Sequence, residues 1–281
     1  YTNNHKTIEN CNCFIVTVPT PVNAKKKPDF SYIKRACKIV GKYLKKNNIV
    51  IFESTVYPGA TEEICVPILE KKSKLIYNTD FYCGYSPERI NPGDKKHTIE
   101  NISKIVSASN SVGLQIVKSI YKNVTKKKLV ISKTIKVAEG AKIIENTQRD
   151  LNIALMNELS ILFKKLNIDF SEVLHAANTK WNFLNFKPGL VGGHCIGVDP
   201  YYLSYKAKKI NFDPKVILSG RKINENMFKY IVKKIIKKYQ NLKASHKNKK
   251  ILVLGLTFKE DVPDCRNSQS IKMVKELLHN K

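Results

Sequence analysis

The stretch GGHCIGVDP at positions 192–200 places a thiol, an imidazole and a carboxylate among three glycines. A cysteine reacts as its thiolate, and His194 stands beside Cys195, where an imidazole can activate the thiol. Asp199, four residues on, can act as a base, and glycine backbone N–H groups can hold an oxyanion. The alternative is a glycine-rich turn around a buried structural cysteine, and this loop alone leaves both interpretations open.

Lysine, asparagine and glutamate at three other positions suit acid–base chemistry. Lys142 and Asn146 are four residues apart in a predicted helix, so they share one face, where the lysine can stabilise charge or act as a base. Glu88, in the sequence SPER, follows a predicted strand, where a carboxylate can orient water. The alternatives are a solvated helix face for Lys142 and a surface pair between Glu88 and Arg89.

Two more groups of residues suit a bound ligand. Lys259 and Arg266 lie in a loop that precedes a helix predicted to begin near Ser268, and a helix N-terminus favours anions. Thr20 and Thr55 close two predicted strands, where hydroxyl groups can meet a cofactor. No metal site is predicted, because the CNC sequence at 11–13 opens an apolar run and has no CxxC partner.

Composition narrows the class of protein. The seven cysteines form no framework, which indicates free thiols in a reducing compartment and therefore a cytoplasmic protein. No apolar run approaches the roughly 20 residues that span a bilayer, so no membrane association is predicted. The net charge is +27, nearly all from lysine. A lysine- and asparagine-rich bias explains this charge better than nucleic-acid binding, which favours arginine, and we expect no nucleic-acid partner.

Several elements must position these residues. Apolar runs alternate with helical patterns in the first third, which predicts a parallel sheet with polar loops at the carboxyl ends of its strands. A long helix without proline follows from about Val137. We therefore predict the α/β class, with a partial Rossmann-like parallel sheet over 1–134, a helical middle domain with the Cys195 loop over 135–245, and the start of a second Rossmann-like domain over 246–281.

The order of several motifs resembles that of the UDP-glucose/GDP-mannose dehydrogenase family. They are TVPTP, ESTVYPGATEE, SPERINPGD, AEGAKIIENTQRDLNIALMNEL, FKPGLVGGHCIGVDPYYL and GLTFKEDVPDCRNS, and they cover essentially the whole chain. Within the family, GGHCIGVDPYYL resembles the branch that oxidises UDP-N-acetylhexosamines. The resemblance implies an NAD domain, a helical domain used to form a homodimer, and a UDP-sugar domain. It also implies oxidation of the C6 alcohol to a carboxylate for surface polysaccharide synthesis, with two NAD as acceptors.

The same resemblance implies a role for each candidate residue. Cys195 is the nucleophile that carries a thiohemiacetal and then a thioester, Lys142 and Asn146 stabilise the oxyanion, and Asp199 and Glu88 handle protons and water. Contacts with NAD are implied for Thr20, Thr55 and Arg266. Contacts with the UDP-sugar are implied for Glu88, Arg89, Lys142, Asn146, Phe186, Lys187, Gly189, Gly192 and Lys259.

One motif of the family does not occur in this chain. The G-x-G-x-x-G phosphate loop would precede Tyr1, so we expect the chain to be part of a longer protein whose isolated activity is weak. Three alternatives stay open, namely a UDP-glucose 6-dehydrogenase, a UDP-ManNAc 6-dehydrogenase, and a non-catalytic remnant that binds sugar nucleotides.

Overall fold

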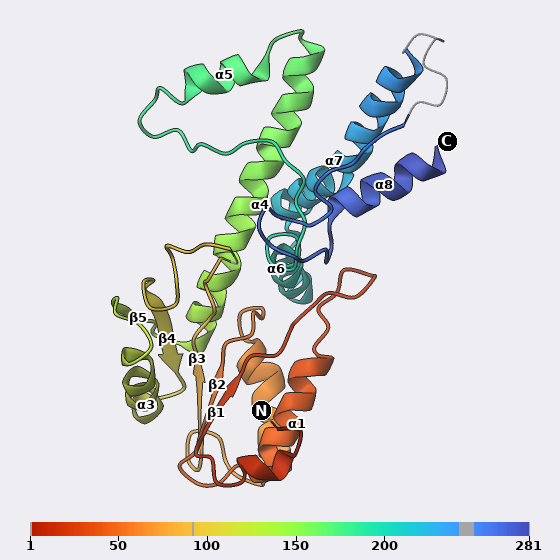
Figure 1. Cartoon of the computed structure of the whole chain (residues 1–281). Helices are drawn as coiled ribbons and strands as arrows, with labels where there is room; N and C mark the ends of the chain where they lie inside the picture. Colours follow the sequence, from red (N-terminus) through yellow and green to blue (C-terminus); the bar gives the residue numbers. More distant parts are fainter. Residues whose placement is uncertain (1, 92, 242–249, 281) are drawn as a thin grey trace. The chain divides into compact units, whose positions relative to one another are not determined.

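The computed structural model describes residues 2–91, 93–241 and 250–280 (Figure 1). It divides the chain into two compact units. The first unit comprises residues 1–145 and 201–212, and the second comprises 146–200 and 213–281. The domain boundaries expected at 134/135 and 245/246 stay a prediction, and the second of them lies outside the described residues.

A five-stranded sheet forms the centre of the first unit, in the order β1-β2-β3-β4-β5. The strands are β1 (Cys13–Val16), β2 (Ile49–Phe52), β3 (Tyr82–Tyr85), β4 (Lys104–Ala108) and β5 (Leu129–Ile131). Neighbouring strands run parallel except for β3 and β4, which are antiparallel. The predicted α/β class is confirmed, and the sheet differs from an all-parallel one in this single pairing.

Helices cover both faces of the sheet, as Figure 1 shows for α1 (Ser31–Tyr43) and α3 (Ser111–Lys122). Helix α2 (Val66–Ser73) packs against α1 and continues a π-helical turn, η2 (Thr61–Cys65). Ile49 and Ile51 pack on α3, and all four residues of β2 are buried because layers cover both of its faces. A strand covered on both sides reads as an unbroken apolar run, as IVIF does in the sequence.

Helices dominate the rest of the chain. The predicted long helix is α4 (Ile135–Lys165), which contributes residues to both units. Asp169 caps α5 (Phe170–Ala177) by accepting a hydrogen bond from the backbone N–H of Ser171, as its sequence position predicts. The other helices are η1 (His5–Ile8), α6 (Asp199–Lys209), α7 (Lys215–Gln240) and α8 (Gln269–His279). None of the helices in the described ranges is long and apolar enough to cross a bilayer.

Residues 251–255, in the segment predicted to start a second Rossmann-like domain, form no strand. The sequence ILVLG has the apolar, β-branched composition of a buried strand, yet Leu252 and Leu254 are each 82% exposed. A strand is stable only when a neighbouring backbone pairs with it, and no described strand pairs with this run. The helix predicted to follow it does form, since Ser268 caps α8 by accepting a hydrogen bond from Ile271 N–H.

Glu139 ties helix α4 to the sheet within the first unit. Its fully buried carboxylate accepts hydrogen bonds from the Gly59 and Thr61 backbone N–H groups, at 2.5 and 2.9 Å, and from the Thr61 hydroxyl at 2.6 Å. These donors belong to the turn that starts η2, so the carboxylate fixes the loop after β2. Burial raises the pKa of Glu139 to about 7, although the three donors act in the opposite direction.

Replacing Glu139 by glutamine should change how stability depends on pH. Between the ordinary value of 4.5 and about 7, the folded state holds a proton that the unfolded state has released, so the free energy of unfolding falls as pH rises. Glutamine does not titrate. The free energy of unfolding of the wild type should therefore fall relative to Glu139→Gln by about 1–3 kcal/mol across this window. Urea titrations at several pH values measure it, and a pH-independent difference would contradict the shifted pKa.

Candidate active site

The carboxyl ends of β1, β2 and β3 meet at one edge of the sheet because the three strands are parallel. The Thr20 hydroxyl donates a 2.6 Å hydrogen bond to the carbonyl of Thr55, which joins the loops after β1 and β2. Ser54 donates to the carbonyl of Val18 at 2.6 Å and ties the same loops together. The two threonines predicted to meet a cofactor therefore lie together on a fixed edge.

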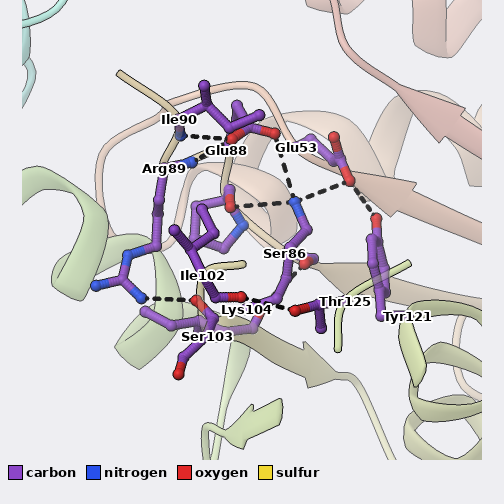
Figure 2. A network of polar contacts seen from close by, with 12 residues as sticks. Glu53, Ser86, Glu88, Arg89, Ile90, Ile102, Ser103, Lys104, Tyr121 and Thr125 are labelled. Atoms are coloured by element: carbon purple, nitrogen blue, oxygen red, sulfur yellow. Dashed lines mark hydrogen bonds and ion pairs between the residues drawn. The ribbon is translucent and has the colours of Figure 1, made fainter. Parts of the chain in front are cut away.

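Glu88 follows β3 at this edge, and Figure 2 shows its surroundings. One oxygen, Oε1, accepts hydrogen bonds from the backbone N–H groups of Arg89 and Ile90, each at 2.6 Å. The Arg89 guanidinium turns elsewhere, pairing with Glu145 at 2.7 Å and donating to the Ser103 carbonyl at 3.1 Å. The surface pair between the Glu88 and Arg89 side chains does not form, and the other oxygen of Glu88 lies near Lys104.

Lys104, the first residue of β4, lies at the same edge (Figure 2). In the antiparallel pairing Gly84 faces Ala108 and Tyr85 faces Ser107, so continuing this register by three residues brings Lys104 opposite Glu88. The ammonium group lies 3.3 Å from Glu53 Oε1 and 3.7 Å from Glu88 Oε2. An antiparallel β4 thus brings a lysine to the edge where the parallel strands end.

In the second unit, Asn146 and Asp199 form one hydrogen-bonded pair. The Asn146 Nδ2 group donates to Asp199 Oδ2 at 2.5 Å, and both side chains are buried. Asp199 begins α6, and its backbone N–H donates to the carbonyl of Cys195 at 2.9 Å. The half-buried Cys195 therefore lies one helical turn before the carboxylate. Lys142, one turn before Asn146 on α4, is buried and belongs to the first unit.

The glycines before Cys195 allow close contact with the loop that carries Lys259. A Cβ atom on Gly193 would lie 2.8 Å from the Phe258 ring, and this residue has a φ of +81° that favours glycine. A Cβ on Gly192 would lie 3.0 Å from Phe258 Cβ and 3.1 Å from the carbonyl oxygen of Asn267. Asn267 also donates to the Gly193 carbonyl at 3.0 Å. Glycine is thus required here for packing within the protein.

Charged groups from the same two loops meet at His194. Arg266 pairs with Asp264 through two of its nitrogens, and this pairing lowers the pKa of Asp264 to about 2. His194 Nδ1 lies 3.6 Å from Asp264 Oδ2. Burial, helped by Arg266, lowers the pKa of His194, so the imidazole beside Cys195 is neutral near pH 7. Among the described residues, no cluster of three His, Cys, Asp or Glu could hold a metal ion.

A buried amide on α4 fixes the loop that contains Phe186, Lys187 and Gly189. Asn157 Oδ1 accepts from the Gly189 N–H and its Nδ2 donates to the Gly189 carbonyl, both at 2.9 Å. Asn157 Nδ2 also donates to Asn224 Oδ1 at 2.8 Å, and Asn224 donates to the buried Asp150. This chain of hydrogen bonds determines where the exposed Gly189 backbone lies.

Sequence reasoning found some of these residues and missed others. It named Thr20, Thr55, Asn146 and Asp199, and the structure brings each of these pairs together. It missed Lys104, Glu53 and Asn157. Glu53 directly follows the apolar run IVIF, which is a usable signal, whereas an isolated lysine before an apolar run and an asparagine in a helix carry none.

The fold and the sheet edge together are those of an α/β protein of the nucleotide-binding class. Three family models match in order along the chain, all for the UDP-glucose/GDP-mannose dehydrogenase family: the NAD binding domain over 1–150, the central domain over 136–226 and the UDP binding domain over 252–281. The chain belongs to the UDP-glucose/GDP-mannose dehydrogenase family.

Individual relatives narrow the comparison. The chain is 52% identical to the UDP-N-acetyl-D-glucosamine 6-dehydrogenase of Pseudomonas aeruginosa over 277 residues, covering 99% of this chain and 66% of that protein. Identity to the protein of the same name from Salmonella typhi is 53%, covering 99% and 65%. The structure of UDP-D-ManNAc dehydrogenase from Pyrococcus horikoshii matches with a TM-score of 0.89 at 33% identity, covering 99% and 65%. The chain thus spans about two thirds of the length of these relatives.

Removing the amide of Asn157 should release the Gly189 loop. Asn157→Ala leaves the Gly189 N–H without its acceptor, so hydrogen exchange at this amide should accelerate by about tenfold or more. Asn152→Ala is the matched control, because this asparagine of the same helix bonds to the Gln148 carbonyl one turn back. Hydrogen exchange at the Gly189 amide is measured by mass spectrometry in both variants. Equal protection in the two would show that Asn157 does not hold the loop.

Proposed function

We propose that the protein oxidises the C6 alcohol of a UDP-N-acetylhexosamine to the uronic acid, with UDP-N-acetyl-D-glucosamine as substrate. The observation that carries the proposal is the second unit's Cys195 turn, where a thiol lies one helical turn before a buried carboxylate bonded to Asn146. Relatives named for this substrate are 52% and 53% identical, whereas the UDP-N-acetyl-D-mannosamine dehydrogenase of Campylobacter jejuni is 34% identical. UDP-glucose and UDP-ManNAc are therefore the alternative substrates.

The residues at the sheet edge fit a dinucleotide. Ligands of open α/β sheets bind outside the carboxyl ends of parallel strands, where the hydrogen-bonded Thr20 and Thr55 lie. Arg266 has a positive charge that suits the phosphates of a cofactor, and it is exposed. When bound, NAD supplies the hydride acceptor for both oxidations.

The chain's own residues supply the remaining chemistry. Asp199 takes the alcohol proton as the first hydride leaves, which gives an aldehyde. The thiolate of Cys195 adds to this carbonyl carbon, and Lys142 and Asn146 stabilise the resulting oxyanion of the thiohemiacetal. Loss of the second hydride leaves a thioester on Cys195. A water molecule oriented by Glu88 then hydrolyses the thioester to the carboxylate and the free thiol.

Binding of the UDP-sugar is assigned to the loop that Asn157 holds, to Lys259 and to Arg89. The backbone of Phe186, Lys187 and Gly192 lies in the same irregular segment as Gly189, whose N–H and carbonyl are held by Asn157. Lys259 and Arg89 add positive charge for an anionic ligand. This arrangement makes the shape of the loop, and not one charged contact, the feature that separates the hexosamine epimers.

A homodimer formed through the helical part is also proposed. Leu155 and Leu162 on α4, and Leu166 directly after its last residue, are about half exposed, at 50%, 47% and 55%, and they follow one another at helical spacing. A helix that keeps such an apolar stripe in water favours a second helix against it. A cytoplasmic location stays a prediction, and all seven cysteines, which lie within the described residues, are free thiols.

Replacing Cys195 tests the proposed reaction. A protein with the full length of the relatives that carries this chain should form two NADH per UDP-N-acetyl-D-glucosamine and less with UDP-ManNAc or UDP-glucose. Cys195→Ser should bind the sugar nucleotide about as well as the wild type. It should form no uronic acid, because a serine oxygen does not replace the cysteine sulfur as nucleophile or in the acyl intermediate. Cys265→Ser is the control, because it removes an exposed thiol that the proposed reaction does not use. Uronic acid formed by Cys195→Ser at the wild-type rate would exclude the nucleophile.

A further inference from the structure

Lys104 is a buried cation that the reaction described above does not use. Its side chain is 1% exposed, in a chain whose many lysines are mostly in contact with water. An ammonium group loses its hydration when it is buried, so it is stable only where charge and hydrogen bonds compensate. Burying the Lys104 ammonium group lowers the stability of the fold unless its partners compensate, so these partners indicate its role.

Two carboxylates and a tyrosine surround the ammonium group (Figure 2). Glu53 Oε1 lies 3.3 Å from the Lys104 nitrogen and also accepts a 2.5 Å hydrogen bond from the Tyr121 hydroxyl. The ring of Tyr121 lies 5.1 Å from the nitrogen, within range for a cation–π contact. The carbonyl of Pro87 accepts a weaker bond at 3.4 Å. Glu53 and Tyr121 thus hold Lys104 from one side.

Glu88, the second carboxylate near the Lys104 ammonium group, is more exposed than Glu53. Its side chain is 41% exposed, and its Oε2 lies 3.7 Å from the Lys104 nitrogen. The Oε1 atom is already engaged by two backbone N–H groups. Oε2 is therefore the atom of Glu88 that can contact both the buried cation and a water molecule.

We propose that Lys104 is a positioning residue for Glu88: its ammonium group orients the carboxylate so that Oε2 can act on the water that hydrolyses the Cys195 thioester. The proposal rests on the proposed function, because it assigns Glu88 to that step. In hydrolysis, water loses a proton to Oε2 as its oxygen bonds to the thioester carbon. The carbon–sulfur bond breaks, and the thiolate of Cys195 leaves. A misdirected Glu88 would slow this step and no earlier one.

The competing explanation is that Lys104 only neutralises Glu53 inside the sheet. Under that explanation, removing the charge of Lys104 lowers stability and leaves the balance between the chemical steps unchanged. Under ours, removing it leaves oxidation intact and delays hydrolysis, so the acylated form of Cys195 accumulates. Intact-mass spectrometry of the protein during turnover separates the two, because it measures the fraction of chain that carries the thioester.

The experiment compares Lys104→Met, which has similar length and no charge, with Lys104→Arg, which keeps the charge. Both are made in a protein of the relatives' full length. Lys126→Met is the matched control, since Lys126 forms an exposed ion pair with Glu100. We expect Lys104→Met to lower kcat by about 10- to 100-fold, with KM changed by no more than about twofold, and to accumulate acylated Cys195. Lys104→Arg should accumulate less, and Lys126→Met should match the wild type.

Glu88→Gln separates failure of this proposal from failure of the proposed function. If Glu88→Gln accumulates no acyl form, the role of Glu88 is wrong. If Glu88→Gln accumulates it and Lys104→Met does not, Lys104 does not position Glu88. Combining Lys104→Met with Glu88→Gln should cause no further loss in kcat, and an additive loss would overturn the proposal. Should Lys104→Met not fold, Lys104→Gln keeps a hydrogen-bond donor without the charge and takes its place.

Discussion

Every polar side chain that helix α4 buries has to find a hydrogen-bond partner, and this requirement organises both units. Glu139, Asn146, Asp150 and Asn157 are spaced by seven, four and seven residues, so they follow one face of the helix, and all are buried. Leaving such a group unsatisfied costs roughly 1–3 kcal/mol or more. Each therefore binds another segment: Glu139 the turn after β2, Asn146 the start of α6, Asp150 helix α7, and Asn157 the Gly189 loop. The buried face of α4 thus determines where the turn after β2 and the Gly189 loop lie.

The sheet edge is built by a different constraint, strand direction. Three parallel strands bring Thr20, Thr55 and Glu88 to one edge, but they cannot bring a residue from the start of a strand there. The antiparallel β4 does so, and Lys104 is its first residue. A parallel β4 would carry its first residue to the opposite edge and leave Glu53 without its cation. One reversed strand therefore supplies the charge that stabilises two carboxylates.

The sequence predicted those parts of the structure that depend on local pattern. Hydrophobic periodicity predicted the long helix, and residue types that favour helix N-caps indicated the starts at Asp169 and Ser268. Neighbouring residues determine these features. The apolar run at 251–255 forms no strand, because a strand depends on a partner elsewhere in the chain. Lys104 was missed for the same reason, since its significance depends on the direction of β4 and on a register with β3. Asn157 was missed because an asparagine inside a helix looks alike whether it faces water or a backbone loop.

The surface lysines and the buried lysines of this protein act over different ranges. Most of its lysines lie at the surface, where a net charge of +27 produces a long-range field that attracts anionic ligands and is screened by salt. Within the described residues, Lys104 and Lys142 are the buried lysines, and each lies in a segment that the proposed function uses. Buried charge is screened little, so its effect is confined to the groups it touches and persists at high salt. Most lysines of this chain thus contribute to its surface charge, whereas the two buried ones matter to the proposed function through their positions.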